Sequence, residues 1–269
     1  MSTHGALGLV SIFGKDAKSD LYKAVVSEGY ALLDELITES ACAQIIKDVK
    51  SKTGCYPFDI SEDHGYKGVF RSPFLFSNGL RDLALNTDLN SILKEFFPTG
   101  YQLHLSRAVF NEAQVGASTL EWHRDMPHMH TYSSSPLSLS ILTFLNSYQN
   151  EVQLVIKDRS HRENFYTFLS ADEIAIQVSP GTSIIFDSNL VHMTPRPKVG
   201  SIAYNLLMFS TPLIKPIVEY TSPAFFRHLL ENPYRVQALL EILGHKFIRP
   251  RDDLEYMMSK VDGPSRKIS

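Results

Sequence analysis

The chain lacks the features that mark several common classes of protein. Its 269 residues include only two cysteines, Cys42 and Cys55, too few for a disulfide framework or an all-cysteine zinc site. With 26 Lys and Arg against 29 Asp and Glu, the net charge of −3 offers no basic footprint for nucleic acid. No uninterrupted apolar run is long enough to cross a bilayer, and the first twenty residues lack a signal-peptide pattern. These absences predict a cytoplasmic protein with no nucleic-acid or membrane partner.

What the chain does contain is the composition of an ordinary folded domain. Hydrophobic residues make up 43% of it and charged residues 20%, which excludes disordered and low-complexity classes. No internal repeat and no linker is evident. We therefore predict a single domain in three parts: a helical region with a lid loop over residues 1–100, a β-rich core over 101–215 and a helical extension over 216–269.

Helical periodicity dominates the first hundred residues. Apolar residues at helical spacing predict a helix over residues 18–28, stopped by Gly29, and a second helix that Thr38 caps. A third helix is predicted over 81–97. Residues 54–79 are rich in Gly, Pro, Ser and aromatics without periodicity, and we interpret them as a long loop or lid.

After Gly100 the pattern changes to short β-rich segments separated by turns. Because no strand alternates with a long helix, a parallel sheet is disfavoured. The order of helices followed by strands indicates an antiparallel sandwich or barrel with flanking helices. The predicted strands are 101–110, 137–145, 152–157, 173–178, 182–187 and 201–210.

Three polar residues of the β-rich half form a candidate metal site. In Trp122-His123-Arg124-Asp125, residues two apart on an extended chain point to the same side, so His123 and Asp125 can converge. His192, just after a predicted strand, can supply a third ligand. Two imidazoles and one carboxylate on one face of a metal are the ligand set of non-haem Fe(II) oxygenases. A surface ion pair is the alternative interpretation of the His-x-Asp spacing.

The order of motifs along the chain resembles the phytanoyl-CoA dioxygenase family of Fe(II)/2-oxoglutarate oxygenases, which includes ectoine hydroxylase. Gly29-Tyr-Ala-Leu-Leu-Asp34 resembles the opening strand of this family, and Trp122-His-Arg-Asp125 resembles its first two metal ligands. Val155 to His161 stands where the family commonly has a Pro-Gly-Ser-His turn. Pro180 to His192 resembles the strand that carries the distal histidine. The resemblance covers residues 29–210.

This resemblance implies a fold, a metal centre and a reaction. The fold is mainly β with flanking helices: a double-stranded β-helix, or cupin-like jelly roll, with Fe(II) held by His123, Asp125 and His192. The implied co-substrates are O2 and 2-oxoglutarate, which is decarboxylated to succinate while a small organic substrate of specialised metabolism is oxidised. Halogenating relatives replace the carboxylate ligand by a small residue, so Asp125 favours hydroxylation or another oxidation.

One departure from the family concerns the co-substrate. The family carries an arginine on the strand after the distal histidine, where its planar fork binds the far carboxylate of 2-oxoglutarate. Here residues 201–210 contain neither Arg nor Lys. Arg196 or Lys198 from the preceding loop could reach in, or another set of side chains could provide the anchor: Tyr204, Ser140 and Arg107. The remaining alternatives are an iron oxygenase that does not use 2-oxoglutarate and a non-catalytic ligand-binding protein on the same scaffold.

The candidate binding residues follow from these alternatives. Ser140, Tyr204 and Arg196 are candidates for the co-substrate. For the substrate we select Arg107, which stands in an otherwise apolar strand, together with Trp122 and Met126 near the metal motif. For Tyr204, a packed core aromatic is the competing interpretation.

Overall fold

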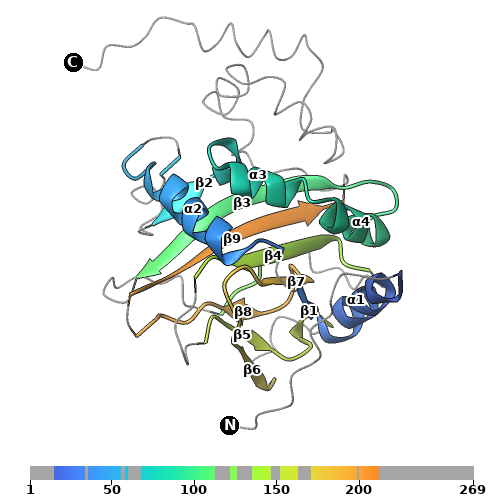
Figure 1. The fold of residues 1–269 in the computed structure, drawn as a ribbon. Coiled ribbons are helices and arrows are strands. Elements are labelled where there is room, and N and C mark those ends of the chain that lie inside the picture. Colours follow the sequence, from blue (N-terminus) through green and yellow to red (C-terminus); the bar gives the residue numbers. More distant parts are fainter. Residues whose placement is uncertain are drawn as a thin grey trace, which may run out of the picture.

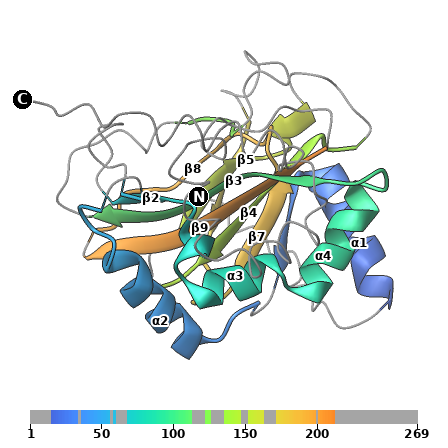
Figure 2. The same ribbon diagram turned by 90° about the horizontal axis from the view of Figure 1, so that it is seen from above.

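The computed structural model describes residues 15–33, 36–55, 58–59, 68–112, 122–125, 135–146, 152–162, 171–198 and 200–211. These residues form three layers: helices, a large antiparallel sheet and a small antiparallel sheet (Figures 1 and 2). Among the described residues, no helix has the length and apolar character needed to cross a membrane. The predicted helical extension over 216–269 lies outside the described residues, so the three-part division stays a prediction.

The large sheet has six strands in the order β1-β7-β4-β9-β3-β2, and every neighbouring pair is antiparallel. Strands that are far apart in sequence therefore lie side by side, because β9 inserts between β4 and β3. The bounds are β1 (Tyr30–Leu33), β2 (Val69–Arg71), β3 (Gln102–Glu112), β4 (Ser138–Phe144), β7 (Ser183–Asp187) and β9 (Ser201–Ser210).

The small sheet has three strands in the order β6-β5-β8, again antiparallel. It consists of β5 (Leu154–Lys157), β6 (Glu173–Ile176) and β8 (His192–Met193). Two antiparallel sheets packed face to face, with non-sequential strand order, form a jelly roll. The predicted mainly β fold with flanking helices, a double-stranded β-helix, is confirmed.

Four α-helices are among the described elements, and α2, α3 and α4 lie across the outer face of the large sheet (Figure 2). Thr38 caps α2 as predicted, since its hydroxyl accepts a hydrogen bond from the amide of Ala41. The helical bounds are α1 (Lys15–Glu28), α2 (Glu39–Lys50), α3 (Asn78–Ala84) and α4 (Thr87–Phe96), with short 3-10 helices η1 (Pro73–Leu75) and η2 (Ser160–Arg162).

Two predictions about this region are wrong. The single helix over 81–97 is two helices, because the side chain of Asn86 accepts hydrogen bonds from the amides of Asp88 and Leu89 and starts α4 anew. The stretch 54–79 is not one long loop, since it contains β2, η1 and the start of α3. β2 was missed because a three-residue strand is too short to show an alternating pattern.

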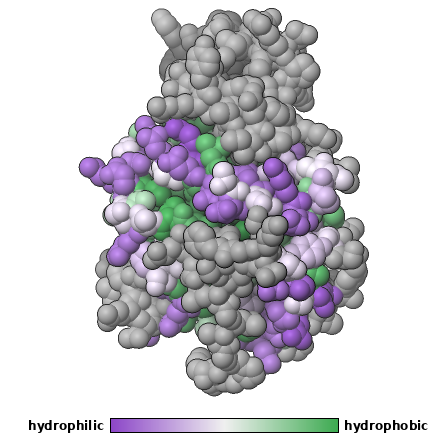
Figure 3. Space-filling model, turned by 45° about the vertical axis from the view of Figure 1, so that its right-hand side comes forward, coloured by the Kyte–Doolittle hydropathy of each residue, from purple (hydrophilic) through white to green (hydrophobic). Residues whose placement is uncertain are grey.

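Apolar side chains form one cluster on each face of the large sheet. The outer cluster joins the helices to residues such as Ile141, Ile185 and Leu207. The inner cluster fills the space between the sheets with residues such as Leu142, Phe186 and Tyr204. Hydrophilic side chains cover most of the described surface in the view of Figure 3, with apolar colour in smaller areas between them.

Two glycines permit close approaches that hold the layers together. Gly29 has φ +92° and ends α1 as predicted, and a Cβ there would lie 2.5 Å from Nδ1 of His161. Gly181 has φ +87° in the turn before β7, and a Cβ there would clash with the carbonyl oxygen of Ile37. Neither position admits another residue without strain.

Candidate metal centre

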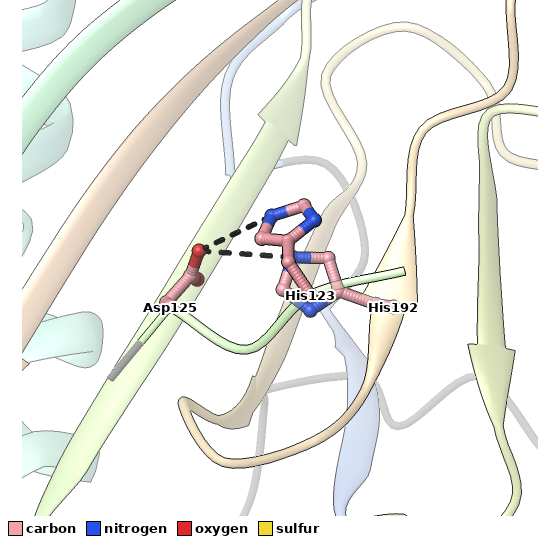
Figure 4. Close-up of side chains that lie close together, drawn as sticks. All are labelled: His123, Asp125 and His192. Atoms are coloured by element: carbon pink, nitrogen blue, oxygen red, sulfur yellow. Dashed lines mark ion pairs between the residues drawn. The ribbon is translucent and has the colours of Figure 1, made fainter. Parts of the chain in front are cut away.

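Three side chains from two separate parts of the chain converge at one end of the jelly roll. His123 and Asp125 come from the segment before β4, and His192 is the first residue of β8 (Figure 4). The Nε2 atoms of both histidines lie 3.7 Å from Oδ1 of Asp125. One ligand atom from each residue lies within 4.8 Å of the other two.

Main-chain hydrogen bonds set the separation of the two histidines. The amide of His123 donates to the carbonyl of His192 over 3.1 Å, and the amide of His192 donates to the carbonyl of His123 over 3.0 Å. This antiparallel bridge places the two side chains on the same side of the backbone. Their ring centroids are 4.4 Å apart.

His192 is held in the tautomer that a metal needs. Its Nδ1 donates to the carbonyl oxygen of Leu190 over 2.9 Å, which leaves the lone pair of Nε2 on the side of Asp125. Burial lowers the pKa of His192, and the nearby His123 lowers it further, against the opposing effect of Asp125. The imidazole is therefore neutral at neutral pH, as a ligand must be.

Asp125 is oriented by serines of the large sheet. The hydroxyl of Ser140 on β4 donates to Oδ2 of Asp125 over 2.6 Å, so that Oδ1 faces the two histidines. Ser188 bonds to Ser140 and to Ser138, each over 2.9 Å, and Ser138 donates to the carbonyl of Phe209. The carboxylate of Asp125 thus stands at the end of a series of buried serine hydroxyls joined by hydrogen bonds.

Arg124, between two candidate ligands, points to the opposite side of its segment and fixes it to η2. Its Nη2 donates to the carbonyl of Ser160 over 3.0 Å, and the hydroxyl of Ser160 accepts from the amide of Val191. η2 therefore connects the segment of His123 to the chain just before His192 through these two hydrogen bonds.

Burial raises the pKa of Asp187, at the end of β7, to about 6, against hydrogen bonds from Asn189 and the charge of Arg124.

The donor set fits iron. Two imidazole nitrogens and one carboxylate oxygen, each with a second hydrogen bond or backbone bridge that fixes it, are the three-ligand face of a non-haem Fe(II) centre. Located at one end of a jelly roll, this site defines a mononuclear non-haem iron oxygenase.

Comparison with known proteins identifies the family. The model of the phytanoyl-CoA dioxygenase (PhyH) family matches residues 25–198, and the chain belongs to this family. The predicted family, and with it the class of Fe(II)/2-oxoglutarate-dependent dioxygenases, is confirmed. No curated protein sequence matches the chain significantly.

Solved structures of the same fold are similar to this chain. EctD from S. alaskensis, crystallised with 2-oxoglutarate and 5-hydroxyectoine, has 17% sequence identity and a TM-score of 0.61 over 79% of this chain and 81% of its own. AviO1 from Streptomyces viridochromogenes Tue57 has 14% identity and a TM-score of 0.57 over 74% and 97%. SnoK, an alpha-ketoglutarate-dependent carbocyclase of nogalamycin biosynthesis, has 13% identity and a TM-score of 0.59 over 76% and 87%. At these identities the likeness shows the shared fold.

The predicted binding residues have different surroundings in the structure. Ser140 bonds to Asp125 and so supports the metal site. Trp122 is half-buried, with Nζ of Lys157 4.8 Å from its ring centroid. Arg196 is exposed in the loop between β8 and β9. Met126 lies outside the described residues.

Tyr204 and Arg107 face the space between the sheets. Tyr204 is buried in the inner cluster, as the packed-aromatic interpretation expected. Burial raises the pKa of Tyr204 to about 12; Asp125 raises it further, while hydrogen bonds with Thr194 and Asn111 and the charge of Arg107 oppose this.

Some residues of the site were missed from the sequence. Ser188, Ser160 and the carbonyl of Leu190 support the ligands through hydrogen bonds, and serines in turns carry no signal of their own. Arg71 is paired with Arg107 across β2 and β3, and finding it required the register of a strand that the sequence did not reveal.

Proposed function

We propose that His123, Asp125 and His192 bind Fe(II), and that the protein uses it with 2-oxoglutarate and O2 to oxidise a small organic molecule. The observation that carries this proposal is the convergence of two imidazoles and one carboxylate within 4.8 Å in a chain of the PhyH family. When bound, iron supplies the activation of O2, which side chains cannot perform.

The protein's own residues position these reactants. Ser140 holds Oδ2 of Asp125, and the carbonyl of Leu190 holds Nδ1 of His192, so three ligand atoms share one face. Iron held by these three residues would have coordination positions left for the 2-oxo acid and O2. His192 is buried beside Phe186 of the inner cluster, whereas His123 is exposed, so the site lies at the edge of the apolar space between the sheets, open to solvent on the side of His123.

Hydroxylation is the simplest outcome that an intact carboxylate ligand supports. Solved structures of similar fold include SnoN, described as an alpha-ketoglutarate-dependent epimerase, and the carbocyclase SnoK. Proteins of this fold that depend on alpha-ketoglutarate therefore carry out reactions other than hydroxylation as well. We propose a small-molecule substrate in specialised metabolism, and a cytoplasmic location remains part of the proposal.

The experiment is a binding and turnover measurement on the whole chain. Protein purified without oxygen receives Fe(II) and then 2-oxoglutarate, and the weak absorption band of the iron–oxo-acid complex is titrated. Admission of O2 should then release succinate in proportion to iron. Asp125→Ala is the matched variant and should show neither signal.

Two results would contradict the proposal. Stoichiometric iron without an absorption band at saturating 2-oxoglutarate excludes the co-substrate, and O2-dependent turnover without succinate would then favour an iron oxygenase of another kind. Failure to bind any iron would favour the non-catalytic scaffold.

A further inference from the structure

The inner face of the large sheet carries positive charge beside the metal site. Arg107 lies on β3. Val109, two residues further along the same strand, belongs to the inner cluster. Ala108, between them, belongs to the outer cluster. Because side chains alternate along a strand, Arg107 faces the interior of the jelly roll.

A second arginine lies directly opposite. In the antiparallel pairing of β2 and β3, Arg71 is the register partner of Arg107. Directly opposite residues share one face with Cβ atoms about 5 Å apart. Val69, two residues before Arg71, belongs to the inner cluster, which confirms the direction. Both arginines are half-buried.

The strand registers also give the distance of Arg107 from the metal site along the sheet. Ser140, which bonds Asp125, pairs with Met208 of β9, while Arg107 pairs with Leu206 of the same strand. Arg107 therefore lies one same-face step, roughly 7 Å, along the strands from Ser140, and two strands, about 10 Å, across the sheet from it. The long side chain of an arginine and a five-carbon dicarboxylate together can span this separation.

Tyr204 is buried one same-face step beyond Arg107, because it pairs with Val109 of β3. Arg196, the rival basic residue from the loop before β9, is exposed. Among the described interior positions of β9, which are Ile202, Tyr204, Leu206 and Met208, no cation is present.

We propose that Arg107 binds the far carboxylate of 2-oxoglutarate, so that the anchoring guanidinium comes from β3 and not from β9, with Arg71 adding positive charge beside it. This inference rests on the proposed function, which supplies the co-substrate. A guanidinium fork pairs with a carboxylate through two parallel hydrogen bonds, an arrangement that an ammonium cannot reproduce. The near end of the co-substrate then lies at the level of Asp125.

The test compares two oxo acids in two proteins. 2-Oxopentanoate has the five-carbon chain of 2-oxoglutarate with a methyl group in place of the far carboxylate. The dissociation constants of both are measured by absorption titration of the anaerobic Fe(II) protein, for the wild type and for Arg107→Gln. The wild type should bind 2-oxoglutarate about 10- to 100-fold more tightly than 2-oxopentanoate. In Arg107→Gln this preference should vanish while the affinity for 2-oxopentanoate stays unchanged.

Further variants make the result specific. Arg107→Lys should recover only part of the preference, since it keeps the charge without the fork. Arg71→Gln should reduce the preference for 2-oxoglutarate by about threefold, because Arg71 acts through its charge alone. Lys94→Gln, which removes an exposed charge of α4, should match the wild type.

Distinct outcomes would overturn the inference. If Arg107→Gln keeps the preference for 2-oxoglutarate, Arg107 is not the anchor, and loss of the preference in Arg196→Gln would assign the loop residue instead. An equal loss for both oxo acids would mean that Arg107 only supports the fold. If the iron-loaded wild type binds neither oxo acid, the proposed function itself fails, and the inference with it.

Discussion

The two faces of the large sheet are made by the same strands and differ in what they carry. On the outer face, β4, β7 and β9 present mainly apolar residues to the helices, including Leu139, Ile185 and Leu207. On the inner face, one residue further along, the same strands present Ser140, Tyr204 and the contacts of the metal site. Alternation along a strand thus separates a face that stabilises the fold from a face that supports chemistry.

The largest expected effect is on the inner face. Asp125→Ala removes the carboxylate that lies 3.7 Å from both histidines. Because loss of a residue that merely supports a ligand costs about 10- to 100-fold, loss of the ligand itself should reduce iron affinity by more than about 100-fold. Iron content after dialysis and succinate release measure this. Asp82→Ala, an exposed change on α3, is the control, and full iron content in Asp125→Ala would refute the assignment.

Neighbouring leucines of β9 test the outer face against the inner one. Leu207 is fully buried in the outer cluster, so Leu207→Ala should lower the free energy of unfolding by about 2–5 kcal/mol, with iron affinity unchanged in the folded protein. Leu206, next to it, is half-buried on the inner face. Leu206→Ala should cost less stability and should change the Michaelis constant of 2-oxoglutarate. Urea unfolding and steady-state kinetics together distinguish the two variants. Equal losses of stability in both would contradict the division of the sheet into a stabilising outer face and a functional inner face.

A pH effect is expected at the end of β7. Burial raises the pKa of Asp187 from its ordinary 3.8 to about 6, so between these values the folded chain keeps a proton that the unfolded chain releases. Stability should therefore fall as pH rises from about 4 to about 6, by up to about 3 kcal/mol from this group. Asp187→Asn should flatten this part of the profile, measured by urea unfolding of the iron-free protein. Asp82→Asn should leave it unchanged, and an unaltered profile in Asp187→Asn would rule out this source.

The smallest expected effects compare two hydroxyls of β4. Ser140→Ala removes the hydrogen bond to Asp125 and should weaken iron binding by about 10- to 100-fold. Thr143, on the outer face, shares a hydrogen bond with Ser183, and Thr143→Val should cost about 1 kcal/mol of stability without affecting iron. Iron titration and thermal unfolding of both variants check this. Iron affinity that falls equally in both would remove the distinction between the faces.

The sequence predicted those features that depend on local pattern. Alternating and helical periodicity located most strands and helices, and His-x-Asp spacing on extended chain brought His123 and Asp125 together as expected. The break at Asn86 was missed because apolar spacing continues through it, although the cap was visible in the residue type. The pairing of Arg71 with Arg107 could not be predicted, since it depends on register between strands separated by more than thirty residues.

Because a backbone bridge joins His123 to His192, iron bound by both residues would stabilise the fold as well as support the reaction. Two hydrogen bonds, of 3.0 and 3.1 Å, join a segment that precedes β4 to a strand of the small sheet and so close a seam between them. Iron held by both histidines would act as a removable cross-link, since it would bind the closed form and not the open one. The metal-free protein should consequently exchange the amide hydrogens of His123 and His192 faster than the iron-bound protein, with the outer face of the sheet little changed.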